Sequence, residues 1–299
     1  MEISDIQVAK HPSWIRQRVS WGVHSEEVKN VLKELKLNSV CISAACPNRG
    51  ECWDKKQVTF MILGKNCTRA CKFCNIHKES TETVDLLEPE RIAQAIKKLG
   101  IRYVVITSVT RDDLPDQGAD QFVRTVRAIK DKTPETAVEL LIPDMGADEK
   151  LLKDIVDAGA DVIGHNIEIP KSLYKTVRPG TGYERSLKVL ETLKKNCSKT
   201  PIKSSMIIGL GEAKSEISDT MKDLHDTGVD IIYVGQYLSP TKEHWPVKKY
   251  YTPEEFRLIE KEAEELGFSV VCSAPMVRSS YMAERAYLQA INEGRNSRE

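Results

Sequence analysis

The chain has 299 residues, of which 29% are charged and 40% are hydrophobic, and its 44 basic side chains balance 44 acidic ones. This composition is typical of globular proteins, and the neutral balance argues against a nucleic-acid or other polyanionic partner. Residues 1–5 lack the basic and apolar regions of a signal peptide, and no stretch of about 18 residues is apolar and free of charge. We therefore expect a cytoplasmic protein with no membrane span.

Short apolar and β-branched runs alternate with amphipathic stretches from residue 57 to residue 266. The runs predict buried strands, and the stretches between them predict helices. Repeated strand–helix units favour parallel pairing with right-handed crossovers, so we expect an α/β fold, a full or partial barrel of TIM type. The strands are expected at 58–62, 103–106, 138–142, 161–163, 203–208 and 230–234, and the helices near 89–99, 119–131, 148–158, 183–195, 214–227 and 253–266.

Two segments flank this predicted barrel. Residues 1–56 show little strand alternation and are expected to form an N-terminal extension. Residues 267–299 are expected to form a C-terminal extension, with a strand candidate at 268–272 and a helix candidate near 280–293. No internal repeat or Pro/Gly-rich linker indicates a second independent domain.

The connection from Leu63 to about Glu88 is long for a loop between a strand and a helix. Loops of that length in compact domains are usually functional or disordered. This one contains three cysteines and begins at the carboxyl end of a predicted strand, where parallel α/β folds bind their ligands. We therefore expect it to carry part of the functional site.

Six of the eight cysteines lie between positions 41 and 74. A disulfide framework is expected in small secreted chains, whereas a long chain without a signal peptide indicates reduced thiols with metal or redox chemistry. The clustering therefore predicts metal ligands.

Cys67, Cys71 and Cys74 have the spacing C-x3-C-x2-C. Three thiolates leave the fourth iron of a cubane cluster open to a small chelating molecule, by the logic that separates catalytic from closed metal sites. A zinc loop with a distant fourth ligand such as His77 is the alternative. The run C-T-R-A-C-K-F-C-N resembles the signature of the radical S-adenosylmethionine (SAM) superfamily, in which an aromatic residue, here Phe73, precedes the last cysteine.

Cys41, Cys46 and Cys52 form a second set with the spacing C-x4-C-x5-C. Buried thiols that serve as small hydrophobic side chains are the alternative interpretation. Followed closely by C-x3-C-x2-C, this set resembles the lipoyl synthase family, which implies a partial (β/α)6 barrel of the radical SAM kind. Further blocks resemble that family in its order, at 60–64, 106–114, 141–144, 165–168, 209–212, 235–238 and 278–281.

The chain departs from the family's pattern at a few positions. Ser43 stands where the family usually has Glu, Ile169-Pro170 replaces Thr-Val, and residues 115–117 interrupt the usual Asp-Gly-Gly. These positions concern local substrate or partner contacts and not the cysteines.

The resemblance implies sulfur insertion at C6 and C8 of a protein-bound N6-octanoyl-lysine. No general base can remove protons from such saturated carbons, so the reaction requires a radical, which the family obtains from SAM at a first [4Fe-4S] cluster. A second, auxiliary [4Fe-4S] cluster is implied to donate the sulfur and to be consumed. The implied partners are octanoylated carrier domains (2-oxoacid dehydrogenase E2 or glycine cleavage H protein), a ferredoxin- or flavodoxin-type electron donor and a cluster-assembly carrier.

The resemblance also assigns Ser280, in Arg-Ser-Ser-Tyr, as the fourth ligand of the auxiliary cluster. On the sequence alone, Ser280 fits the N-cap of the final helix equally well. Cys272 is a rival ligand, although its place in a strand candidate favours a buried residue. Cys197 is expected to be a surface thiol.

Several residues near the ends of the predicted strands are implied to contact SAM, although each one alone could make a structural hydrogen bond. His165 is either a buried core histidine or a ligand, and the glycines at 209–212 are weak evidence for a phosphate loop. The implied SAM contacts are Phe73, Thr107, Ser108, Asn166, Glu168 and Arg178.

Two other functions compete with this interpretation. A different radical enzyme, for example one that modifies transfer RNA, would share the C-x3-C-x2-C loop, but an RNA enzyme usually carries a basic module and none is evident in the sequence. A zinc-binding adaptor would explain only the number of cysteines.

Overall fold

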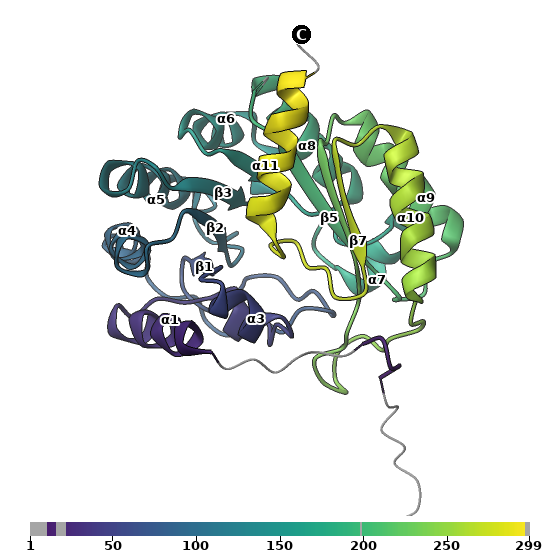
Figure 1. Cartoon of the computed structure of the whole chain (residues 1–299), viewed down its shortest axis with the longest axis horizontal. Helices are drawn as coiled ribbons and strands as arrows, with labels where there is room; N and C mark the ends of the chain where they lie inside the picture. The colour runs from purple at the N-terminus through teal and green to yellow at the C-terminus, as the bar shows by residue number, and fades with distance from the viewer. Residues whose placement is uncertain (1–10, 16–21, 198, 297–299) are drawn as a thin grey trace, which may run out of the picture.

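The computed structural model describes residues 11–15, 22–197 and 199–296. Seven parallel strands form one sheet, in which they follow chain order from β1 at one edge to β7 at the other. The crossover helices lie along the outer face of the curved sheet (Figure 1). The strands are β1 (Thr59–Ile62), β2 (Tyr103–Ser108), β3 (Ala137–Leu141), β4 (Val162–Gly164), β5 (Ile202–Ile208), β6 (Ile231–Gln236) and β7 (Val270–Ala274).

The crossover helices confirm the predicted periodicity, with ends within a residue or so of those expected. Local signals fix several ends: Gly100 ends α4 in the left-handed conformation, and Thr252 forms a capping box with Glu255 at the start of α10. The crossover helices are α4 (Glu88–Leu99), α5 (Ala119–Lys132), α6 (Glu149–Asp157), α8 (Tyr183–Asn196), α9 (Lys214–Asp226) and α10 (Pro253–Leu266), and the short elements η1 (Met145–Ala147), η2 (Lys171–Leu173) and α7 (Tyr174–Val177) lie between some of them.

The extensions contain helices that the sequence patterns only partly predict. The final helix begins three residues later than expected, and the helices of the N-terminal extension were not predicted. Two of these are too short to be stable alone and depend on tertiary packing. The helices are α1 (Val23–Glu34), α2 (Val40–Ser43), α3 (Arg49–Asp54) and α11 (Ala283–Asn296). None of the helices in the described part combines the length and apolar character needed to cross a bilayer.

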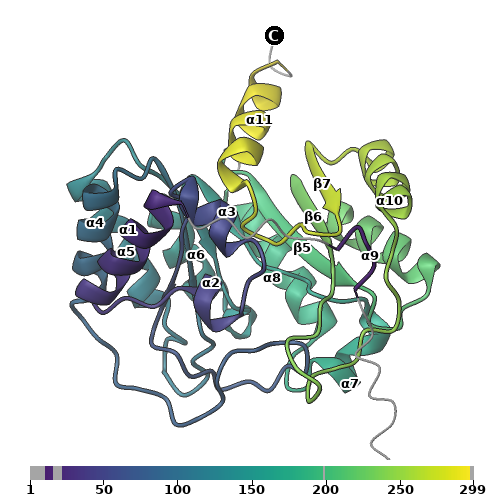
Figure 2. The same cartoon turned by 60° about the horizontal axis from the view of Figure 1, so that its bottom comes forward.

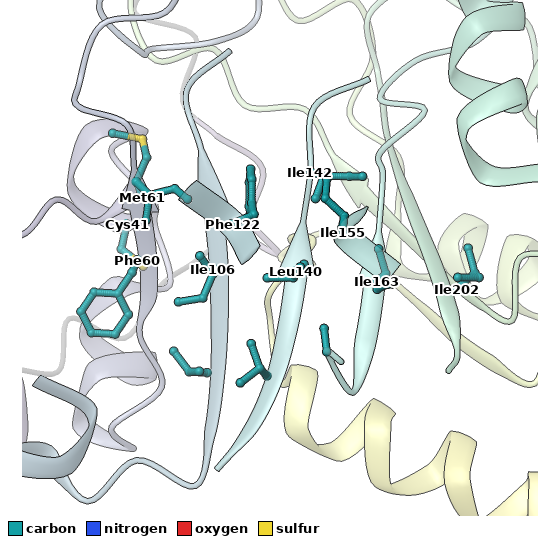
Figure 3. Close-up of a cluster of buried hydrophobic side chains, with 14 of the residues drawn as sticks. Cys41, Phe60, Met61, Ile106, Phe122, Leu140, Ile142, Ile155, Ile163 and Ile202 are labelled. Atoms are coloured by element: carbon teal, nitrogen blue, oxygen red, sulfur yellow. The ribbon is translucent and has the colours of Figure 1, made fainter. Parts of the chain in front are cut away.

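Strand alternation decides which side chains face the helices and which face the interior of the barrel. Phe60, Ile106, Leu140 and Ile163 occupy one row of the register across β1 to β4. They pack with helix residues such as Phe122 in the main buried cluster (Figure 3). The neighbouring positions of each strand therefore face the opposite way, into the barrel.

The sheet stays open between β1 and β7, and the two extensions cover this side. Ser39 forms a bridge with Phe60 at the free edge of β1. Asn48 Nδ2 donates to the carbonyl of Met276 at 2.7 Å, which joins the N-terminal extension to the segment that leads into α11. Figure 2 shows α3 next to that segment. The partial barrel is thus closed by residues from both ends of the chain.

Candidate active site between two cysteine segments

A cavity of about 550 Å³ lies inside the barrel, and all six cysteines of the two predicted sets line it. Its walls include Met61 of β1, Val105 and Thr107 of β2, and Tyr233 of β6. These are the inward-facing positions that alternate with the helix-facing row. The structure therefore brings together two cysteine segments that the sequence places on either side of β1.

The loop of the first set is anchored by backbone hydrogen bonds to three places. Cys67 N donates to His77 O at 2.8 Å, Thr68 N donates to Thr110 O at 3.1 Å, and Lys72 N donates to the carbonyl of Val177, at the end of α7, at 2.8 Å. The loop therefore wraps over the carboxyl end of β2.

Arg69, which the sequence analysis did not single out, ties this loop to two strand ends. Its guanidinium donates to both carboxylate oxygens of Asp144, at 2.6 and 2.8 Å, and to both of Asp112, at 2.8 and 2.9 Å. Asp144 is fully buried. Burial would raise the pKa of Asp144, but pairing with Arg69 outweighs it and lowers that pKa to about 2. Such forked pairs fix geometry as well as charge.

The thiols of the first set lie in a protected environment. Burial raises the pKa of Cys71, and it raises the pKa of Cys74 to about 12, with neighbouring Cys67 acting in the same direction. Thiolates there require a strong positive charge such as a metal centre.

All of the predicted SAM contacts, Phe73 among them, line the cavity. Glu168 lies in the left-handed region with φ 68°, which is unusual for a non-glycine residue and is often found at functional sites. Its carboxylate accepts a hydrogen bond from Asn166 Nδ2 at 3.1 Å. Ser108 Oγ and Arg178 Nε are buried and have no hydrogen-bond partner within the described residues. Orphaned polar atoms on a cavity wall fit a polar ligand.

His165 also lines the cavity, but its ring is fully engaged. One nitrogen lies 2.9 Å from the carbonyl of Ile142, and the other lies 3.0 Å from the hydroxyl of Ser186. Burial lowers the pKa of His165 to about 4, so the ring is neutral near pH 7. These contacts favour the core-histidine interpretation.

The second set lies on α2 and α3, with Cys41 in α2, Cys46 in the connection and Cys52 in α3. The hydroxyl of Ser39 accepts from Cys41 N at 3.2 Å and donates to the carbonyl of Thr59 at 2.8 Å, which fixes α2 against β1. Burial raises the pKa of Cys52 to about 12, with added repulsion from Cys46 and Cys41. The three thiols thus share one environment.

The C-terminal segment completes this second site. A side chain at Gly235 of β6 would lie 2.1 Å from the carbonyl of Val277, so only glycine permits the close approach. The next residue, Arg278, donates to the carbonyl of Val277 at 2.6 Å. Burial raises the pKa of Cys46, and the positive charge of Arg278 partly offsets this rise. Ser280 reaches the same cavity.

The structure also addresses the alternatives for the remaining residues. Helix α11 begins at Ala283, so Ser280 is not at its N-cap position. Cys272 lies in β7 and is not among the described residues that line the cavity. The prediction of a surface thiol at Cys197 is wrong, because this residue is only 7% exposed. It directly follows α8, and its Sγ lies 3.9 Å from the carbonyl of Thr200. Helix packing buries this small thiol despite its charged neighbours in sequence.

One hydrogen bond joins the two cysteine segments directly. Asn75, which follows Cys74, donates through Nδ2 to the carbonyl of Ser43 at 2.9 Å. Ser43 lies between Cys41 and Cys46, so a shift of one segment moves the other. In the sequence, Asn75 stands out only as the last residue of the run C-T-R-A-C-K-F-C-N.

The donor sets fit iron–sulfur clusters. Each set supplies three soft thiols, the usual ligands of such clusters. All eight cysteines are free thiols, so none is used in a disulfide. Within the described part of the chain, no three His, Cys, Asp or Glu side chains lie close enough together to hold a single metal ion.

The chain is similar to known proteins over most of its length. The model of the Radical SAM superfamily matches residues 61–224. The chain is 48% identical over 275 residues to the lipoyl synthase of Caldicellulosiruptor saccharolyticus, covering 92% of this chain and 96% of that protein. It is 48% identical over 272 residues to the lipoyl synthase of Rubrobacter xylanophilus, covering 91% and 85%.

Solved structures confirm the predicted fold class. Methylornithine synthase aligns with a TM-score of 0.54 at 13% identity, over 87% of this chain and 84% of the other. HydG, a maturase of the [FeFe]-hydrogenase, aligns with a TM-score of 0.54 at 12% identity, over 89% and 74%. The extent of the sequence match to the curated relatives sets aside the alternative radical enzyme and the zinc adaptor, and the chain belongs to the lipoyl synthase family within the radical SAM superfamily.

Proposed function

We propose that this lipoyl synthase family member uses two [4Fe-4S] clusters to insert sulfur at C6 and C8 of a carrier-bound N6-octanoyl-lysine. The observation that carries the proposal is the shared cavity, which both cysteine sets line. A radical made at one set could act on a carbon that lies beside the other, without release of substrate between steps.

Cys67, Cys71 and Cys74 would hold the first cluster. When bound, this cluster would supply the electron for reductive cleavage of SAM. The chain's own residues bind and orient the cosubstrate. Arg178, whose buried Nε has no hydrogen-bond partner among the described residues, would bind the methionyl carboxylate. The other proposed contacts are Phe73, Thr107, Ser108, Asn166 and Glu168, which share the cavity wall.

The auxiliary cluster is consumed as a sulfur-donating substrate, and Cys41, Cys46, Cys52 and Ser280 would bind it. A hydroxyl ligand leaves more easily than a thiolate, which suits a cluster that is dismantled. Support for Ser280 comes from its place in the cavity and from the helix start at Ala283, which removes the capping alternative.

The apolar walls would protect the reaction. Met61, Val105 and Val277 line the same cavity as the two sets. Apolar side chains favour a hydrocarbon substrate and exclude water from reactive intermediates.

We further propose that residues 1–56 act as the auxiliary-site extension, 57–266 as the radical SAM barrel and 267–299 as the extension that supplies Ser280. The proposed partners are octanoylated carrier domains of E2 or H-protein type, a ferredoxin- or flavodoxin-type donor and a cluster-assembly carrier. Since the proposed reaction requires SAM and cluster assembly, which are intracellular, we propose a cytoplasmic location.

The test uses protein reconstituted under anaerobic conditions and mixed with an octanoylated carrier domain, SAM and a reductant. We expect about eight irons per chain and a carrier mass increase that corresponds to two sulfur atoms. A fully reconstituted protein with only about four irons, or a carrier without sulfur in the presence of cleaved SAM, would contradict the proposal.

A further inference from the structure

Strand β2 lines the cavity along its whole length. Tyr103, Val105 and Thr107 face inward at alternate positions, and Ser108 lines the wall at the carboxyl end. The rise of a strand places Tyr103 about 16 Å from Ser108. Because the C-x3-C-x2-C loop lies over the carboxyl end of β2, Tyr103 marks the opposite end of the cavity.

The Tyr103 side chain is held rigidly by buried polar partners. Its hydroxyl donates to Glu139 Oε2 at 2.6 Å, and Lys203 Nζ donates to Glu139 Oε1 at 2.8 Å. The Lys203 and Glu139 side chains are only 3% and 2% exposed. The Lys203 ammonium also lies 4.2 Å from the ring centroid of Tyr233, a second tyrosine of the cavity wall. Buried ion pairs contribute little net stability, so the main effect of this one is to fix geometry.

A second cavity lies behind Tyr103. Its volume is about 320 Å³, and it is lined by Tyr287 of α11 and by polar residues such as Arg102 and Asp161. Tyr103 and Glu284 line both cavities. The Tyr287 ring lies 5.5 Å from the Tyr103 ring, centroid to centroid. Tyr103 is therefore part of the wall between the two spaces.

The chemistry of the proposed substrate makes the position of this wall important. The carbonyl of the octanoyl chain is bonded to a lysine of the carrier, so the methyl end must enter the cavity first. Of the reacting carbons, C8 is the leading methyl carbon itself, and C6 is two bonds behind it. The depth at which the methyl group stops therefore decides which carbons lie beside the two cysteine sets.

We propose that Tyr103 is the stop for the methyl end of the acyl chain and so determines chain length. This inference rests on the proposed function, since it requires an acyl substrate. A rigid aromatic wall, braced by Glu139 and Lys203, admits eight carbons and excludes longer chains because they would clash with the ring. With the wall removed, a longer chain can extend into the second cavity.

The test compares octanoyl and decanoyl groups on the same carrier domain. In Tyr103→Ala we expect the ratio of decanoyl to octanoyl thiolation to rise about tenfold or more over the wild-type ratio, with sulfur still at C6 and C8. Tyr103→Leu removes less of the wall, and we expect a smaller rise in the same direction. An unchanged ratio in both variants would overturn the proposal.

Two matched variants separate the wall from other effects. Tyr103→Phe keeps the ring but loses the hydrogen bond to Glu139, and we expect the wild-type chain-length ratio. Tyr287→Ala enlarges only the second cavity and leaves the wall in place, so the same result is expected. A shift in Tyr287→Ala equal to that in Tyr103→Ala would show that packing of α11, and not Tyr103, sets the length.

Binding measured without clusters distinguishes this inference from the proposed function. Octanoyl- and decanoyl-lysine peptides are titrated into cluster-free protein by calorimetry. We expect wild type to prefer the octanoyl peptide and Tyr103→Ala to lose that preference. If Tyr103→Ala loses the preference for the octanoyl peptide while no variant inserts sulfur, the proposed function fails and the role of Tyr103 stands. If Tyr103→Ala keeps the wild-type preference, only the role of Tyr103 is contradicted.

Discussion

The two cysteine segments are held in place by different kinds of interaction. The loop with Cys67, Cys71 and Cys74 is fixed through Arg69, whose guanidinium is paired with carboxylates at the ends of two barrel strands. The segment with the second set makes neutral contacts with backbone carbonyls through Asn48 and Asn75, beside an ion pair of half-exposed side chains between Lys55 and Glu51. One of these neutral contacts joins residues 228 positions apart in sequence.

This difference suits two sites with different fates. Buried, forked ion pairs give a fixed geometry, and removal of one partner is costly. Single neutral hydrogen bonds contribute about 1 kcal/mol each and are broken more easily. Under the proposed function, a first cluster that is used repeatedly would benefit from the rigid setting. An auxiliary cluster that is consumed would have to be replaced, which is easier where the surrounding segments can separate.

The largest expected effect separates the roles of the two sets. Cys67→Ala should abolish SAM cleavage and therefore sulfur insertion. Cys41→Ala should retain SAM cleavage and abolish insertion. Both products are measured by mass spectrometry in the same anaerobic reaction. If Cys41→Ala lost cleavage and Cys67→Ala kept it, the two assignments would have to be exchanged.

Replacement of Arg69 tests the rigid setting. Arg69→Met leaves the fully buried Asp144 without its main partner, and we expect a loss of about 3–5 kcal/mol in the free energy of unfolding. Arg185, 3.6 Å from Asp144, is too exposed to compensate fully. Urea denaturation of cluster-free protein gives the stability.

Iron analysis of the same protein extends this test. We expect Arg69→Met to lose iron from the first site while the second is retained, with Cys41→Ala as the reference for a chain that lacks the second site. Equal stability of Arg69→Met and wild type would show that the ion pairs do not anchor the loop.

The free energy of unfolding should fall at acid pH because of His165, which lines the same cavity as the first set. Its folded pKa of about 4 is below the usual value of 6.5, so the unfolded state takes up the proton first. The contribution of the neutral ring is therefore complete above about pH 6.5 and is lost as the pH falls toward 4, by about 3 kcal/mol in total.

The comparison variant for this effect is His165→Gln, which cannot titrate in this range. We expect the free energy of unfolding to fall more steeply between pH 7 and pH 5 in wild type than in the variant. Parallel curves from urea denaturation at each pH would contradict a buried, neutral His165.

The smallest expected effect tests the link between the segments. Asn75→Ala should cost about 1 kcal/mol and lower the number of sulfur atoms inserted per SAM cleaved, with cleavage itself retained. Asn75→Asp keeps the shape but replaces the donor with an acceptor, so it should behave like Asn75→Ala. An unchanged ratio in both variants would show that Asn75 does not position the second set.

The sequence by itself determined the fold class and predicted many of the residues that line the cavity. Short apolar runs and helical periodicity predicted the six barrel strands and their crossover helices, because strands of a parallel sheet are buried on both faces and the helices bury one face. Cysteine spacing and the blocks that follow identified the family, since ligands on one loop are separated by a few residues. The short helices α2 and α3 were not predicted, because their stability comes from packing and not from propensity.

Only the tertiary structure decided how these parts meet. Arg69 and Asp144 are 75 positions apart in sequence, and Asn75 and Ser43 are 32 positions apart. Tyr103, between the two cavities, packs against Tyr287, which is 184 positions away. Such contacts leave no local period in the sequence, because they depend on the directions in which separate strands and loops point after the barrel forms. The residues of the site were therefore predictable, whereas the interactions that position them were not.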